Sequence, residues 1–390
     1  MLLMHKNIPI AKVRIDNHII LGYDEIYNEK ELPLGTRGNG KQQEQILLNQ
    51  WYASRSIPGI RPNLRNIEEK IGIRKSDMFF YNSGISITDT YWFKEEDEEI
   101  NWKDINYHDN GFDPVFASYY FNFDTNGKIS PDYTTDGIME KFWFMSGDKP
   151  YLAKIDTKNE NTLSANEIVY FKAAAMAGIT TTPYLYGTTK TKKFCICPCF
   201  INNSEEDYIS AMQIKHNDFS LFGEMLIRFF IEKLNYEKEM KQMITLDCLF
   251  HNKDRHEKNF GIKRTKNGFE FIAPFDNGYC LGADKQIGAK ITDSDMKIFN
   301  YSRHEILNRY GIELQIDRTA ILNVLQDTYE LFNISEQRYE IAKEELEYGF
   351  NLIKGAGKMK EYISKGISFT NDKINLSDID VSDTSELERD

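Results

Sequence analysis

Residues 254–259, with the sequence DRHEKN, contain two side chains whose types and spacing suit phosphoryl transfer. That chemistry needs a cation on the phosphates, oxygen ligands for a metal ion, and an acceptor for the proton of the attacking hydroxyl. The carboxylate of Asp254 can orient and deprotonate a hydroxyl, and the amide oxygen of Asn259 can reach Mg²⁺. We therefore predict a catalytic loop here.

A further oxygen ligand follows in the chain at Asp276. The sequence after Asn259 has the pattern of a hairpin, with a turn at Asn267 and Gly268 and a second strand, FEFIAPFDNG, that delivers Asp276. Folding back in this way would bring Asp276 beside Asn259. We predict these two residues as the metal ligands and Asp254 as the catalytic base.

A competing interpretation is a metal-dependent hydrolase site formed by His251, Asp254 and His256, which are close in sequence. It would leave Asn259 and Asp276 without a role, so we favour phosphoryl transfer and expect His256 to fix the loop by hydrogen bonding. A plain polar turn is the simplest alternative for the Asp–Asn pair taken alone.

Lys154, in the segment YLAKI, is the candidate phosphate-binding cation. Strand alternation places it on the same face as Leu152. The following helix offers Glu167 as an ion-pair partner that could hold the ammonium over the phosphates. Residues 164–167 equally have the form of a helix capping box, which would give Glu167 a local role instead.

The loop before this strand, ISPDYTTDGIMEK, could place backbone N–H groups over the phosphates, with Gly137 as its only glycine. Thr134 and Thr135 in this loop are ordinary turn residues by default and candidate regulatory phosphorylation sites. Three arginines further upstream, Arg55, Arg61 and Arg65, could form a partner-binding patch or a solvated helix face.

The elements that position these residues follow from periodicity and breaker residues. We expect a β-rich start, helices over 42–55 and 63–71, a solvated acidic loop over 94–104, two strands within 138–155, and a helix over 165–177. Cys195, Cys197 and Cys199 alternate along one face of a further strand, which favours burial over metal binding. Helices are expected over 219–234, 236–250 and 294–354, and an acidic, disordered tail follows.

Composition narrows the functional class. The 390-residue chain is 41% hydrophobic and 13% aromatic and has a formal net charge of −12, which argues against direct nucleic-acid binding or binding to anionic membranes. Five cysteines suggest no disulfide framework, and residues 1–10 lack the pattern of a signal peptide. We therefore expect a cytoplasmic protein.

The order Gly137, Lys154, Glu167, DRHEKN and PFDNG, together with NEIVYFKAAAMAGI, resembles the HipA family of bacterial serine/threonine kinases, which are toxins of toxin–antitoxin pairs. The resemblance implies an α+β, two-lobed protein-kinase-like fold with bound ATP and Mg²⁺. Glu167 would pair with Lys154, Asp254 would be catalytic, and Asn259 and Asp276 would bind metal.

From this resemblance we expect an N-terminal module (1–125), a small lobe (126–202), a helical large lobe (203–366) and the acidic tail (367–390). Backbone groups near Phe200 and Ile201 would contact adenine. A protein substrate and an antitoxin-like partner are implied.

The phosphate loop TTDGIMEK departs from the family pattern because it is poorer in small residues. Phosphatidylinositol kinases share the D-R-H-x-x-N loop, so a lipid kinase is an alternative. A non-catalytic nucleotide- or partner-binding module is another.

Overall fold

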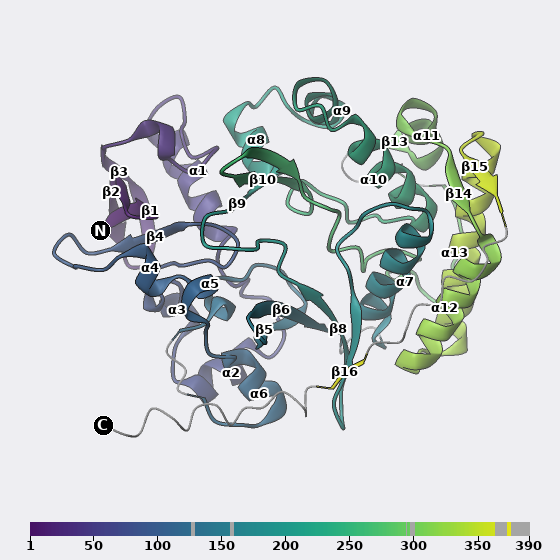
Figure 1. Ribbon diagram of the computed structural model, residues 1–390, viewed down its shortest axis with the longest axis horizontal. Helices are drawn as coiled ribbons and strands as arrows, with labels where there is room; N and C mark the ends of the chain where they lie inside the picture. Colours follow the sequence, from purple (N-terminus) through teal and green to yellow (C-terminus); the bar gives the residue numbers. More distant parts are fainter. Residues whose placement is uncertain (126–128, 157–159, 294, 297–300, 363–372, 376–390) are drawn as a thin grey trace.

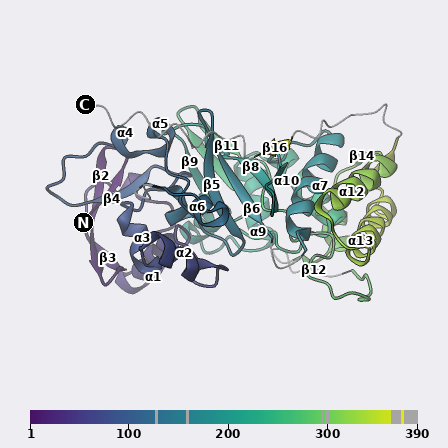
Figure 2. The same cartoon turned by 90° about the horizontal axis from the view of Figure 1, so that it is seen from below.

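The structure is a computed structural model that describes residues 1–125, 129–156, 160–293, 295–296, 301–362 and 373–375. Figure 1 shows an elongated molecule with the N-terminal module at one end and the helices of the large lobe at the other. The view from below in Figure 2 keeps this order, with the strands of the small lobe between the two ends. The expected α+β fold, β-rich at the start and helical towards the C-terminus, is confirmed.

The N-terminal module is built on a four-stranded antiparallel sheet in the order β3-β2-β1-β4. Alternating β-branched residues form the first three strands, as the sequence predicts. The fourth strand arrives from much later in the chain and pairs with β1. The strands are β1 (Leu2–His5), β2 (Ile8–Asp16), β3 (Ile19–Ile26) and β4 (Tyr91–Lys94).

Short helices connect this sheet to the small lobe. The two helices expected from periodicity are present within two residues of the predicted bounds, and the acidic loop is largely exposed. The helices of this part are η1 (Glu29–Glu31), α1 (Lys41–Ala53), α2 (Leu64–Ile71), α3 (Lys75–Tyr81), α4 (Trp102–Ile105), α5 (Tyr107–Asn110), α6 (Val115–Phe121) and η2 (Pro131–Thr134).

The three arginines were expected to form a solvated helix face or a partner-binding patch, and both interpretations are wrong for two of them. Arg55 and Arg61 are buried, and only Arg65 lies on an exposed helix face. Arg55 donates to Asp89 and to a backbone carbonyl of β4, so it holds the module together. Sequence spacing could not reveal this, because both buried arginines lie between helices, where helical periodicity does not apply.

The small lobe contains a five-stranded sheet in the order β16-β7-β8-β6-β5. Its first two strands form the predicted hairpin, in which Lys141 lies directly opposite Lys154. Its strands are β5 (Glu140–Ser146), β6 (Lys149–Ile155), β7 (Leu185–Thr188), β8 (Lys193–Pro198) and β16 (Lys373–Asn375). β16 lies within the stretch predicted as an acidic, disordered tail, and its three residues pair in parallel with β7. The rest of the predicted tail lies outside the described residues.

Helix α7 (Thr162–Met176) begins earlier than the sequence predicts. Ser164 therefore lies inside the first turn and not at the N-cap, which is Asn161. The Ser164 hydroxyl donates to the backbone oxygen of Lys154 at 3.1 Å. The capping-box interpretation of residues 164–167 is thus wrong, and Glu167 is available for a tertiary contact.

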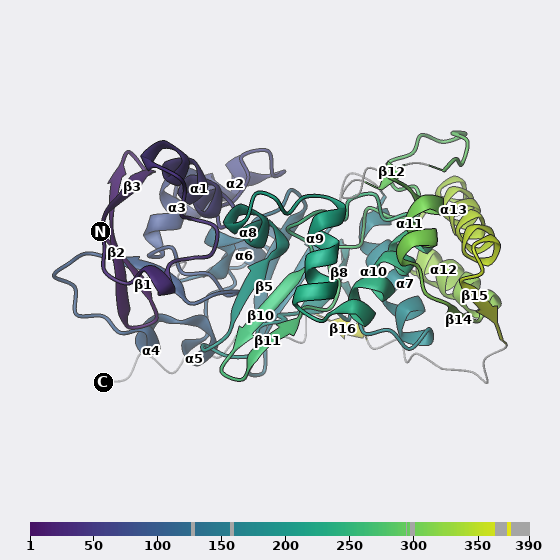
Figure 3. The same cartoon turned by 90° about the horizontal axis from the view of Figure 1, so that it is seen from above.

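The large lobe begins with a three-stranded sheet in the order β11-β10-β9. Figure 3 shows β10 and β11 of this sheet side by side, seen from above. Thr265 pairs with Gly268, so the turn residues of the hairpin are Lys266 and Asn267, one position earlier than predicted. The second strand ends at Phe271, and Asp276 lies on the loop beyond it. The strands are β9 (Asp207–Ser210), β10 (Gly261–Thr265) and β11 (Gly268–Phe271).

Helices form the rest of the large lobe, and α10, α12 and α13 pack with α7 around the largest apolar core. The helix expected over 219–234 is shorter than predicted, because it begins only after Gly223, whose φ of 52° breaks the helical run. The remaining elements are α8 (Ala211–Asn217), α9 (Glu224–Arg228), the π-helix η3 (Phe229–Lys233), α10 (Glu237–Phe250), β12 (Asp295–Met296), β13 (Tyr301–Ser302), α11 (Arg303–Tyr310), β14 (Leu314–Ile316), α12 (Arg318–Phe332), α13 (Glu336–Gly355) and β15 (Met359–Glu361). The helical region expected over 294–354 thus starts at α11 and is interrupted by β14.

One apolar core crosses from the N-terminal module into the small lobe. It joins Ile57, Leu64 and Ile67 to Phe142 and Phe144 of β5. These side chains are almost fully buried, and each contributes roughly 1.5–3 kcal/mol relative to an exposed position. The segment between α1 and α2 is therefore fixed on the small-lobe sheet.

Candidate active site

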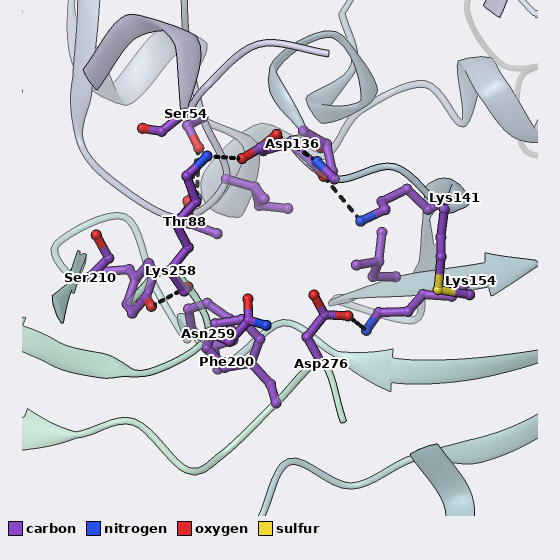
Figure 4. A pocket seen from close by; sticks show the side chains of 18 of the residues that line it. Ser54, Thr88, Asp136, Lys141, Lys154, Phe200, Ser210, Lys258, Asn259 and Asp276 are labelled. Atoms are coloured by element: carbon purple, nitrogen blue, oxygen red, sulfur yellow. Dashed lines mark hydrogen bonds and ion pairs between the residues drawn. The ribbon is translucent and has the colours of Figure 1, made fainter. Parts of the chain in front are cut away.

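A cavity of about 530 Å³ lies where the N-terminal module, the small lobe and the large lobe meet. Figure 4 shows its polar lining, with Lys141 and Lys154 on one side, Asn259 and Asp276 below, and Lys258 joined to Asp136 by an ion pair. Residues from each part contribute: Ser54, Ile60 and Thr88 from the module, Leu152 and Cys197 from the small lobe, and Asp254 and Phe275 from the large lobe.

Lys154 joins the two lobes at the base of this cavity. Its Nζ atom donates to Glu167 Oε1 at 2.6 Å and to Asp276 Oδ1 at 2.7 Å. β6 places it on the same face as Leu152, as predicted, and Leu152 also lines the cavity. Glu167 and Asp276 come from segments more than a hundred residues apart, so the ion pairs depend on the tertiary fold.

Burial and charge act in opposite directions on this group. Burial lowers the pKa of Lys154, but the carboxylates of Asp276 and Glu167 outweigh it and hold that pKa well above its usual range. Burial likewise raises the pKa of Asp276, yet Lys154 and Lys141 bring it below its usual range. The lysine is therefore cationic and Asp276 anionic at neutral pH.

Glu167 is the inner member of the pair. It is fully buried, and its second oxygen accepts a hydrogen bond from the backbone N–H of Asn277 at 2.7 Å. Both carboxylate oxygens are thus used, one on the lysine and one on the segment that carries Asp276. Of the two interpretations that the sequence left open, the geometry selects the ion pair.

Tyr184 is a member of the site that sequence reasoning missed. Its hydroxyl accepts hydrogen bonds from Lys154 Nζ and from the backbone N–H of Asp276, both at 3.1 Å. Asp276 adopts a left-handed conformation, with φ of 58°, which is uncommon for a residue other than glycine. The tyrosine therefore helps to hold both the lysine and an unusual backbone conformation.

The predicted catalytic loop also lines the cavity and contributes both Asp254 and Asn259. The amide nitrogen of Asn259 donates to the backbone oxygen of Asp254 at 3.2 Å, which leaves the amide oxygen of Asn259 for another partner. The ring of His256 accepts from the backbone N–H of Lys258 at 3.2 Å, so the predicted role of His256 in fixing the loop is confirmed.

Arg255 fixes the same loop from beneath. Its guanidinium donates to both carboxylate oxygens of Asp247 on α10, at 2.8 and 3.1 Å, and to the backbone oxygens of Asn259 and Phe275 at 3.0 and 2.9 Å. A further bond reaches the side chain of Asn277. One buried side chain thereby connects the catalytic loop to the loop that carries Asp276.

The structure gives no support to the hydrolase interpretation. His251 is buried outside the cavity, and its Nδ1 atom lies 3.0 Å from Glu345 Oε2 on α13. In the part of the chain that the structure describes, no three His, Cys, Asp or Glu side chains form a group suited to a metal ion.

The wall between β8 and β9 is apolar and aromatic. Phe200, Tyr208 and Phe275 pack with ring centroids 5.1–5.8 Å apart, and Phe200 lines the cavity. Ile201 does not line it, because its side chain packs into a core shared with the N-terminal module. Cys197 and Cys199 do line the cavity, and burial raises the pKa of Cys197 to about 11 and of Cys199 to about 12. Both thiols are thus neutral.

The loop carrying Gly137 forms the roof of the cavity, and two cations missed by sequence reasoning hold it. Lys141 Nζ donates to the backbone oxygen of Asp136 at 3.0 Å, and Lys258 Nζ pairs with the Asp136 carboxylate at 2.8 Å. Gly137 has φ of 102°, a conformation that other residues rarely adopt.

The two threonines of this loop are not equivalent. Thr134 is buried, and its hydroxyl donates to the backbone oxygen of Ile85 at 2.6 Å. Thr135 is partly exposed, and its hydroxyl donates to Pro131 and accepts from Trp143. Thr134 would therefore have to leave its site before it could be modified.

Searches against known proteins place the fold. No family model and no curated protein matches the sequence. The HipA structure from the Shewanella oneidensis MR-1 complex of HipA, HipB and operator DNA matches with a TM-score of 0.53 and 12% identity, over 92% of this chain and 97% of that one. The Helicobacter pylori proinflammatory kinase CtkA matches with a TM-score of 0.45 and 17% identity, over 56% of this chain and 90% of that one.

In the described residues, no helix combines the length and apolar character needed to cross a membrane. The match to the HipA structure extends over nearly the whole chain. The chain has a HipA-like kinase fold.

Proposed function

We propose that this protein is an ATP-dependent serine/threonine kinase that uses Mg²⁺ and phosphorylates a protein hydroxyl. The observation that carries the proposal is the position of Lys154, which contacts Glu167 and Asp276 at the base of a cavity that also contains Asp254 and Asn259. These are the cation, the metal ligands and the base that phosphoryl transfer requires.

The donor set fits a nucleotide with its metal. Asp276 is anionic, its side chain is 38% exposed, and only its Oδ1 atom is engaged by protein among the described residues. The amide oxygen of Asn259, which has no partner among the described residues, supplies a second hard ligand of the kind Mg²⁺ prefers. When bound, Mg²⁺ and ATP supply the transferable phosphoryl group and neutralise charge on it.

The remaining roles belong to the side chains. Lys154, oriented by Glu167, holds phosphate oxygens, and the loop containing Gly137 covers them. Asp254 orients the acceptor hydroxyl and takes its proton. The aromatic wall that includes Phe200 excludes water from the bottom of the cavity. Backbone groups near Phe200 and Ile201 are the proposed contacts for adenine.

The test is transfer of radiolabelled γ-phosphate with Mg²⁺ to the protein itself and to proteins of a cytoplasmic lysate. Wild type should label protein, and Asp254→Asn should lose at least about 100-fold, because general-base catalysis contributes about that much. Lys253→Gln, a partly exposed neighbour, is the matched control. Tight ATP binding without transfer to protein would overturn the proposal, and lipid labelling would identify a lipid kinase.

A toxin role and an antitoxin-like partner are further parts of this proposal and rest on the likeness to HipA, which was solved with HipB and operator DNA. Expression of wild type should arrest bacterial growth, and Asp254→Asn at equal protein level should not. Equal growth of both strains would remove the toxin role and leave the kinase assignment to the labelling experiment.

A further inference from the structure

The segment between α1 and α2 carries Arg61, a buried side chain that contacts the Gly137 loop at the roof of the cavity. Arg61 Nε donates to the backbone oxygen of Gly137 at 2.9 Å, and its Nη2 atom donates to the backbone oxygen of Thr135. The side chain is only 3% exposed and does not itself line the cavity. It therefore holds the loop from the side away from the substrate.

These two contacts fix the direction of two peptide planes. In a trans peptide the N–H of the next residue points opposite to the carbonyl, so the N–H groups of Asp136 and Ile138 point away from Arg61. Among the described residues neither N–H has a hydrogen-bond acceptor, whereas the intervening N–H of Gly137 bonds to the Asp136 side chain at 2.7 Å. Asp136 and Ile138 both line the cavity.

The positive charge of Arg61 also favours an anion near this loop. Burial lowers its pKa to about 10, so it remains cationic at neutral pH. In the described part of the chain no carboxylate lies within ion-pair distance of it, and its Nη1 atom is buried without a partner. A buried cation without a counter-ion is costly, and a nearby anion relieves that cost. An anion bound by the N–H groups of Asp136 and Ile138 would be such a counter-ion for Arg61.

Arg61 is also held in place. Ile57 and Leu64, on either side of it in sequence, belong to the core that includes Phe142 of β5. The backbone N–H of Arg61 donates to the oxygen of Pro58 at 3.0 Å, which closes a tight turn. The arginine is thus delivered by a rigid segment, and its contacts with the loop do not depend on a flexible surface side chain.

From these contacts we propose that Arg61 is a positioning residue through which the N-terminal module shapes the phosphate-binding loop. By holding the carbonyl groups of Thr135 and Gly137, it leaves the N–H groups of Asp136 and Ile138 for the phosphates of a nucleotide. The proposal rests on the kinase function above and assigns the module a part in nucleotide binding.

The first test is the dissociation constant for ATP with Mg²⁺, measured by calorimetry on the full chain. Arg61→Ala should weaken binding about tenfold or more, since two charge-assisted bonds that order the loop are lost. Arg61→Lys should recover part of the affinity because an ammonium can still reach one carbonyl. Arg65→Ala, four residues away on the exposed face of α2, is the matched control and should bind as wild type does.

A second readout follows the loop without any nucleotide. Trp143 Nε1 donates to the Thr135 hydroxyl at 2.8 Å, so a fluorine label on Trp143 reports the position of that threonine. In protein labelled with 5-fluorotryptophan, Arg61→Ala should shift or broaden the Trp143 signal, assigned through Trp143→Phe. The signals of Trp92 and Trp102 should stay in place, which also shows that the variant is folded.

The outcomes separate the two proposals. Unchanged ATP affinity in folded Arg61→Ala, or in Arg61→Lys and Arg61→Gln if the alanine variant unfolds, overturns the role of Arg61. Wild type that binds ATP but transfers no phosphate removes the kinase function, and the affinity series still decides the role of Arg61. Wild type that binds no ATP overturns both.

Discussion

Lys154 and Arg255 are two buried cations with different surroundings: Lys154 lines the cavity, whereas Arg255 does not line it. Arg255 donates to five acceptors, all from protein, and is enclosed by the large lobe. Lys154 has two carboxylates and a hydroxyl, and one of those carboxylates, on Asp276, is open to the cavity. Arg255, whose hydrogen-bond donors are all paired within the protein, stabilises the fold. Lys154 can exchange its contact with Asp276 for one with a substrate.

The largest effect on stability is expected when Arg255 is removed. Arg255→Met should lower the free energy of unfolding by about 3–5 kcal/mol, because Asp247 would stay buried without its cation. Urea unfolding followed by circular dichroism measures this change. Lys253→Met, which removes a partly exposed ion pair with Asp284 next to the same loop, should change stability by no more than about 1 kcal/mol. A loss below about 1 kcal/mol for Arg255→Met would contradict the scaffold role.

Removing Lys154, by contrast, should reduce activity while the protein still folds. Lys154→Met should reduce kcat/KM for ATP about 100-fold, a loss of about 2.7 kcal/mol of transition-state stabilisation, while the protein still folds. Burial already raises the pKa of Glu167, so this carboxyl group can take up a proton when its cation is lost. Lys149→Met at the exposed start of β6 is the control. Equal activity of the two variants would refute the phosphate role.

Lys141, a further buried cation at the cavity, extends the comparison to the dependence of ATP affinity on pH. Burial lowers the pKa of Lys141 to about 8, so this side chain is cationic below pH 8 and loses its charge above it. ATP affinity should therefore fall, by roughly fivefold, as pH rises from 7 to 9. Lys141→Gln should bind more weakly at pH 7 and lose most of this dependence. Dissociation constants measured across the pH range for both proteins test it, and parallel curves would exclude Lys141.

The smallest effect is expected at the ion pair between Asp136 and Lys258, which bridges the roof and the catalytic loop. Both side chains are partly exposed, so Asp136→Asn should change stability by no more than about 0.5 kcal/mol. It should tighten ATP binding about two- to threefold at low salt, because a carboxylate near the phosphates is removed. The gain should disappear in high salt. Tighter binding that persists there would show that charge is not the cause.

The sequence allowed prediction of those site residues that local pattern identifies. Strand alternation placed Lys154 on the same face as Leu152, and both residues line the cavity; the spacing of Asp254 and Asn259 indicated a loop that contributes both side chains. The hairpin that follows could be predicted from its turn residues, with an error of one position. Each of these features lies within a few consecutive residues.

Features that depend on distant segments could not be predicted. Arg61 reaches a loop more than seventy residues later, and Tyr184 connects two residues from different lobes. Glu167 illustrates the limit, because its local sequence suits either a helix cap or an ion pair. The earlier start of α7 and the proximity of Lys154 decide between them. Neither is encoded in the four residues of the apparent capping box.

The core that joins α2 to β5 also determines how the chain unfolds. Ile67 and Phe142 lie on either side of residue 125 in sequence but belong to one buried cluster. Elements that share a core lose it together, so this part of the molecule should melt in a single cooperative transition. A protease cut near residue 125 would separate two fragments that each expose an apolar face, and the nicked halves should remain associated until that common core opens.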